Sequence, residues 1–134
     1  DNAIVLATRL AKHPDVAQVY YPARSRGLQS AILHRQMSGP GCVLAFELHP
    51  GVDADRLLQA LQLITPAVSL GSVDTLIQRP AALTHRVVDP KARAESGVSE
   101  GLLRLSVGIE DAEDLWADLQ QAIAASSNGM ARAA

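Results

Sequence analysis

Residues 102–109 read Leu-Leu-Arg-Leu-Ser-Val-Gly-Ile, and this stretch decides the fold. Every second residue from 103 to 109 is apolar, which predicts a β-strand with one face in a hydrophobic core. The other face carries Arg104 and Ser106. An arginine in an apolar strand must reach water or an anion, because an unpaired buried charge is very costly. Its planar guanidinium suits a carboxylate, and a structural ion pair or a solvated face is the alternative.

Outward from this strand, helical and extended patterns alternate along the chain. Asp53 and Asp111 are predicted N-caps, since their carboxylates can accept free backbone N–H groups at a helix start. The expected helices cover 1–13, 28–37, 54–64, 90–96 and 112–125, and the expected strands cover 16–21, 42–48, 68–78 and 102–109. This order predicts an α/β (α+β) sandwich, with a sheet of about four strands covered by helices.

Composition restricts the class of protein. The chain has 134 residues, 48% of them hydrophobic and 19% charged, which fits one globular domain. A net charge of −2 does not favour nucleic acid or an acidic membrane surface as partner. A single cysteine excludes an internal disulfide. No apolar run is long enough to span a bilayer, so we expect a soluble, cytoplasmic protein without membrane contact.

Most residues capable of chemistry have simpler interpretations. The four histidines are scattered, and none forms an i, i+4 pair that would hold a metal. Cys42 opens an apolar strand and is expected to be a buried, inert thiol. The acids at 110, 111, 113 and 114 surround a helix start, where they complement the helix dipole; a metal site is the alternative. We expect no metal site.

Ser69, Leu70 and Gly71 interrupt an extended stretch at a glycine. Such a kink can present backbone N–H groups and a hydroxyl to an anion. An ordinary bulge or turn is the alternative, and the kink taken alone favours it.

Taken together, these stretches resemble the pyridoxal-phosphate (PLP)-dependent transsulfuration enzymes of cysteine and methionine metabolism, such as cystathionine γ-synthase, the cystathionine lyases, methionine γ-lyase and the homoserine-ester sulfhydrylases. Ser-Leu-Gly and the Leu103–Asp111 stretch carry the resemblance most specifically. The other matching stretches are 19–22, 35–39, 46–48, 75–77, 80–81, 84–85 and 97–98.

The resemblance covers only the family's small C-terminal domain, of the fold-type I (aspartate aminotransferase-like) class. It implies that residues 1–125 form this domain, that 126–134 are a frayed tail, and that a large PLP-binding domain is absent. The family's lysine, which binds the cofactor as a Schiff base, belongs to that large domain. Neither Lys12 nor Lys91 lies in the corresponding sequence context.

The resemblance also assigns substrate-binding residues. Arg104 would bind the substrate α-carboxylate, Ser69 would lie beside it, and Leu70 would contribute at most its backbone. No catalytic or cofactor-binding residue is implied within the chain. Val68, before the kink, is more similar to the methionine γ-lyase or sulfhydrylase type than to cystathionine-handling members. The basic stretch 24–30 and Cys42 depart from the family pattern.

The function expected from the resemblance is that of a domain of a carbon–sulfur lyase or transferase. The complete enzyme would use PLP for elimination or replacement at Cβ or Cγ of a sulfur amino acid or homoserine ester, and would form a homo-oligomer. Without the N-terminal domain the chain should be inactive. Two alternatives are a stand-alone, non-catalytic module that binds an amino acid or a partner, and a folded relic without function.

Overall fold

The computed structural model describes residues 2–82 and 98–127. The helix expected over 90–96, Lys91 and the tail from residue 128 lie outside these ranges. In chain order the elements are α1 (Asn2–Leu10), β1 (Val16–Tyr20), the 3₁₀ turn η1 (Pro22–Arg24), α2 (Leu28–Gln36), β2 (Val43–Leu48), α3 (Ala54–Ala60), β3 (Thr65–Pro66), β4 (Leu76–Gln78), β5 (Leu102–Ser106) and α5 (Ala112–Ser126).

The strands form one mixed sheet in the order β1-β2-β5-β4-β3. All neighbours are antiparallel except β3, which runs parallel to β4. The sheet therefore has five strands where about four were expected. The additional strand has only two residues and contains Pro66, which is compatible with an edge because proline has no N–H to donate.

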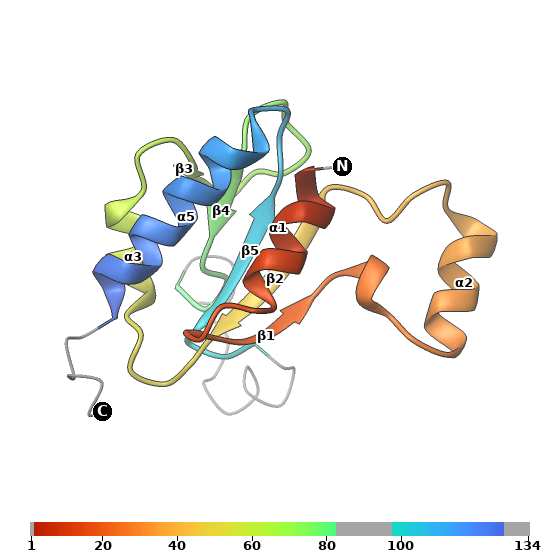
Figure 1. The fold of residues 1–134 in the computed structure, drawn as a ribbon, viewed down its shortest axis with the longest axis horizontal. Coiled ribbons are helices and arrows are strands. Elements are labelled where there is room, and N and C mark those ends of the chain that lie inside the picture. The colour runs from red at the N-terminus through yellow and green to blue at the C-terminus, as the bar shows by residue number, and fades with distance from the viewer. Residues whose placement is uncertain (1, 83–97, 128–134) are drawn as a thin grey trace.

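One face of the sheet is covered by α1, α3 and α5 (Figure 1). Leu103 and Leu105 of β5 are fully buried on this face, as the alternation in 102–109 predicts. They join one hydrophobic core with residues of the flanking strands and helices, including Leu6, Leu44, Phe46, Leu57, Leu115, Leu119 and Ile123. Arg104 therefore lies on the opposite face of the sheet.

Both predicted N-caps are confirmed. Asp53 accepts the N–H groups of Asp55 and Arg56, and Asp111 accepts those of Glu113 and Asp114. α5 continues through Ser126, one residue past the expected domain end. The confirmed caps show that the starts of α3 and α5 are fixed by local sequence.

The helix expected to reach residue 64 is shorter. α3 ends at Ala60 because Asp118 of α5 accepts the next backbone donors, those of Gln62, Leu63 and Ile64, at 2.8, 2.9 and 2.8 Å. These N–H groups would otherwise continue the α-helical pattern. A tertiary contact thus replaces the last helical turn.

The expected strand 68–78 is mostly a loop, and only Leu76–Gln78 is extended in the sheet. Gly71 has φ +78°, a left-handed conformation that interrupts any strand there. The prediction for Cys42 is wrong: the strand begins one residue later, and the thiol is exposed.

Residues 22–42 form an arm that projects from the sheet between β1 and β2, with α2 at its far end (Figure 1). α2 buries none of its residues, and Leu28 is 77% exposed. Among the described residues, α2 therefore contributes nothing to the hydrophobic core.

None of the helices in the described part of the chain has the length and apolar character required to cross a membrane.

Candidate functional site

Arg104 occupies the centre of β5 on the face away from the helices. Its cross-strand neighbours are Ala45 on β2 and Gln78 on β4. The half-buried side chain extends to the 68–71 loop, where its Nη2 donates to the carbonyl oxygen of Ser69 at 2.8 Å and to that of Val68 at 3.3 Å. The structure therefore brings Arg104 and the Ser-Leu-Gly kink together, although 35 residues separate Arg104 from Ser69.

The kink itself is held by β5. The N–H of Gly71 donates to Oγ of Ser106 at 2.8 Å, and Ser106 is fully buried. Arg104 and Ser106 are two positions apart and therefore share one face of β5. The strand that carries the guanidinium thus also fixes the loop beside it. Leu70 is 54% exposed and turns its side chain to solvent.

A second brace fixes the other end of this loop. Glu110 accepts from the N–H and hydroxyl of Thr75, and the N–H of Gly108 donates to the same hydroxyl oxygen at 2.8 Å. Burial alone would raise the pKa of Glu110, but the two hydrogen bonds from Thr75 outweigh burial and lower the pKa of the carboxyl. The loop is therefore tied to the sheet by an ionised carboxylate.

No carboxylate in the described part of the chain pairs with Arg104. Its described hydrogen bonds go to neutral backbone carbonyls, which leave the positive charge uncompensated. A half-buried guanidinium in this state can bind an incoming carboxylate through charge-assisted hydrogen bonds. The ion-pair interpretation of Arg104 is thus not supported within residues 2–82 and 98–127.

Lys12 is the only lysine among the described residues, and it is exposed, two positions after the end of α1. Among these residues, no hydrogen bond or ion pair joins Lys12 to Arg104.

The remaining candidates from the sequence have structural roles. Of the four clustered acids, Asp111 caps α5, Glu113 pairs with Arg9 of α1, and Glu110 holds Thr75. Only part of this cluster therefore serves the helix start, as was expected of all of it. Across the residues with described positions, no group of three or more His, Cys, Asp or Glu side chains could hold a metal ion.

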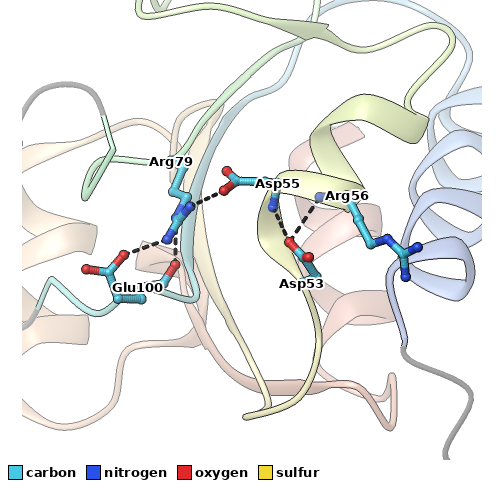
Figure 2. Close-up of polar contacts among 5 residues, drawn as sticks. All are labelled: Asp53, Asp55, Arg56, Arg79 and Glu100. Carbon is cyan, nitrogen blue, oxygen red and sulfur yellow. Dashed lines mark hydrogen bonds and ion pairs between the residues drawn. The ribbon is translucent and has the colours of Figure 1, made fainter.

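An ionic cluster that was not predicted surrounds Arg79, the residue after β4 (Figure 2). Its Nη1 lies 2.7 Å from Oδ2 of Asp55, Nη2 contacts the carboxylate of Glu100, and Nε donates to the Glu100 carbonyl at 2.8 Å. The cluster lines a hollow of about 480 Å³ together with His49. Sequence gives no signal for it, because its members meet only when β4, α3 and the turn before β5 assemble.

Comparison with protein families gives one match over almost the whole chain. Residues 1–124 match the family described as Cys/Met metabolism PLP-dependent enzyme. An L-methionine gamma-lyase of Pseudomonas putida is 50% identical over 127 residues, which are 94% of this chain and 32% of that protein. An L-methionine gamma-lyase of Streptomyces avermitilis is 49% identical, over 91% of this chain and 25% of that protein.

Solved structures agree with this match. The cystathionine gamma-lyase of Lactobacillus plantarum, complexed with L-serine, superposes with a TM-score of 0.87 at 39% identity, covering 93% of this chain and 33% of that one. A cystathionine gamma synthase from Xanthomonas oryzae gives 0.83 at 42% identity, with the same coverage. The chain spans a quarter to a third of the length of these relatives. It belongs to the Cys/Met metabolism PLP-dependent enzymes and has a fold of their fold-type I class.

Proposed function

We propose that this chain is the small C-terminal domain of a transsulfuration-type enzyme, in which it binds the α-carboxylate of the substrate. Arg104 is the binding group, the Ser69 hydroxyl lies beside the same carboxylate, and Leu70 contributes backbone. The observation that carries the proposal is the contact of Arg104 with the Ser69 carbonyl, in a guanidinium that no described carboxylate neutralises.

Binding of this kind would orient the amino acid. Two parallel hydrogen bonds from a guanidinium fix the plane of a carboxylate, and thereby the direction of the Cα–H bond. Holding reacting groups in a defined geometry accounts for a large part of enzymatic rate enhancement. The proposed contribution of this domain is therefore positioning.

The cofactor of the family, PLP, supplies an electron sink for negative charge at the substrate carbon. The described residues do not fit its covalent attachment, because the single described lysine, Lys12, is exposed after α1 and makes no described hydrogen bond or ion pair with Arg104. We propose that the remaining two thirds of the enzyme, as in the length of the relatives, bind the cofactor, and that this chain is inactive by itself. A homo-oligomer of the whole enzyme belongs to the same proposal.

The substrate class is a sulfur amino acid or a homoserine ester, with elimination or replacement at Cβ or Cγ. Methionine is the first substrate to test. An apolar Val68 precedes the kink, and the two curated relatives described above are named methionine gamma-lyases.

The test uses the protein as its gene encodes it, assayed for α-keto acid release from methionine, cystathionine and homoserine esters. We expect Arg104→Ala to lower kcat/KM by about 100-fold or more, as for loss of a buried charged partner. Arg104→Lys should recover part of this loss, and the exposed control Arg24→Ala should have no effect. Equal activity of Arg104→Ala and the unmodified protein would contradict the assignment.

A separate experiment mixes the 134-residue chain with PLP and methionine. We expect no Schiff-base absorbance and no α-keto acid. Clear turnover would overturn the proposed inactivity. Binding of methionine without turnover, lost in Arg104→Ala, would instead favour a stand-alone amino-acid-binding module.

A further inference from the structure

Two polar atoms that face the same side of the sheet lack partners. Nε of Arg104 and Oε1 of Gln78 are both buried, and neither has a hydrogen-bond partner in the part of the chain that the structure describes. One is a donor and the other an acceptor. An unpaired buried polar atom is costly, so each requires an explanation.

The sheet places these residues directly opposite each other. Gln78 of β4 is the register partner of Arg104 of β5 in an antiparallel pair. Side chains of such partners emerge on the same face, with their Cβ atoms about 4.5–5.5 Å apart. On the other side of Arg104 the partner is Ala45, whose methyl group has no acceptor. Gln78 is thus the cross-strand residue able to accept from Nε.

One nitrogen of the guanidinium already has hydrogen-bond partners. Nη2 donates to the carbonyls of Val68 and Ser69, which sets the distance of the group from the loop but leaves its rotation about that contact open. A second hydrogen bond, donated by Nε, would fix the plane of the group. Because Gln78 is neutral, it could do so without cancelling the positive charge.

Resting on the proposed function, we infer that Gln78 is a positioning residue for Arg104. When a carboxylate binds, the side-chain oxygen of Gln78 accepts the Nε–H of Arg104 and orients the guanidinium, so that its Nη atoms face the ligand. Gln78 is 3% exposed and follows two apolar strand residues, so among the described residues neither solvent nor a structural pair accounts for its side-chain oxygen.

The test is a titration of the ¹⁵N-labelled 134-residue chain with acetate, observing the Arg104 Nε–Hε signal, which is identified by its loss in Arg104→Lys. We expect acetate to move this signal downfield and to slow its exchange with water. Gln78→Met should abolish both effects and weaken acetate binding about tenfold, as for a hydrogen bond to a charged group. Gln78→Glu, which keeps an acceptor oxygen, should retain the downfield signal, and the exposed Gln29→Met should behave as the unmodified chain.

The outcomes separate the two proposals. If acetate does not affect the Arg104 signal, Arg104 does not bind carboxylates, and both the proposed function and this inference fail. If acetate moves the signal equally in the unmodified chain and in Gln78→Met, Arg104 binds the carboxylate without Gln78, and only the inference fails. If the Arg104 signal of Gln78→Glu is not downfield even without acetate, the inference also fails, because the acceptor oxygen retained at residue 78 does not reach Nε.

Discussion

Glu110 accepts two hydrogen bonds from Thr75, one from its backbone N–H at 2.6 Å and one from its hydroxyl at 2.7 Å. The same hydroxyl oxygen accepts from Gly108, so three segments meet at the side chain of Thr75, which is almost fully buried. The loop that carries Ser69 is therefore held at its end by a carboxylate from beyond β5.

Glu110→Gln should weaken this brace. The amide keeps one acceptor and places an NH₂ group against a donor, which should lower the free energy of unfolding by about 1–3 kcal/mol. Urea denaturation followed by circular dichroism measures the change. Glu113→Gln, at an exposed pair with Arg9, is the matched control and should have a much smaller effect. Equal losses in both variants would contradict a specific role for Glu110.

Asp118 should make the stability depend on acid pH. Burial alone would raise the pKa of this carboxyl, but the backbone N–H groups of Ile64, Gln62 and Leu63 lower it below its usual range. The contribution is therefore complete above the unfolded pKa of about 3.9 and is lost as the pH falls through the lower folded pKa. Asp118→Asn should be less stable at pH 7 by about 2–3 kcal/mol.

The check on Asp118 is urea denaturation of both proteins between pH 2 and pH 7. The free energy of unfolding should fall less steeply with acid in Asp118→Asn than in the unmodified chain. Parallel curves over this range would show that Asp118 is not the group responsible.

Gly108→Ala should displace the 73–75 loop. An added Cβ would lie 2.7 Å from the carbonyl carbon of Asp74 and would clash with the carbonyl oxygen of Val73, both of which are backbone atoms that cannot rotate away. We expect a loss of about 1–3 kcal/mol in the free energy of unfolding. Gly39→Ala is the control, because nothing lies within 4 Å of its added Cβ. A tolerated Gly108→Ala would mean that the loop is free to move.

Arg79→Met should uncouple β4 from α3. The methionine keeps much of the apolar volume of a side chain that is only 16% exposed, but removes contacts with Asp55 and Glu100. We expect a loss of about 1–2 kcal/mol, and less for Asp55→Asn at the more exposed partner. A double-mutant cycle of Arg79 and Asp55, measured by urea denaturation, gives their coupling. Simple additivity would show that the pair does not interact.

Ser106→Ala tests the link between the kink and the proposed carboxylate site. The substitution leaves the N–H of Gly71 without its acceptor and frees the backbone around Ser69. In the whole enzyme we expect KM for the amino acid to rise about tenfold with a smaller change in kcat, since one hydrogen bond is lost. A steady-state assay with methionine measures both constants. A change in kcat alone would argue against a role in substrate binding.

Local chemistry explains which parts of the fold were predictable. The apolar alternation predicted a strand over 102–109 and the opposite direction of Arg104, and Leu103 and Leu105 are buried as expected. The strand ends at Ser106, however, and Ile109, expected on the buried face, is 81% exposed. Asp53 and Asp111 gave the starts of two helices, because a cap involves only residues two or three positions apart. The end of α3 was not predictable, since Asp118, more than fifty residues later, takes the N–H groups that would have continued the helix.

Some residues of the candidate site could be predicted from the sequence, and others could not. The sequence pattern and the family resemblance singled out Arg104 and Ser69, and the structure brings them together. The sequence predicts Ser106 only as a residue on one strand face. Its hydrogen bond with Gly71 could not be predicted, because it depends on where the 68–71 loop packs against β5. Gln78 was likewise inconspicuous, since the register between β4 and β5 is set by the packed sheet rather than by neighbouring residues.

The projecting arm has a consequence for how this fold can vary. The chain leaves the sheet after Tyr20 and returns in β2, where Ala45 is the register partner of Tyr20. At the base of the arm, the Tyr21 hydroxyl donates a hydrogen bond to the Gly41 carbonyl. Residues 22–42 are thus a long connection between the two strands of a β-hairpin, and the register of the strands does not depend on them. Doubling the length of such a connection costs only about 0.6 kcal/mol of loop-closure entropy. Insertions and deletions can therefore accumulate in the arm while the sheet that carries Arg104 stays unchanged.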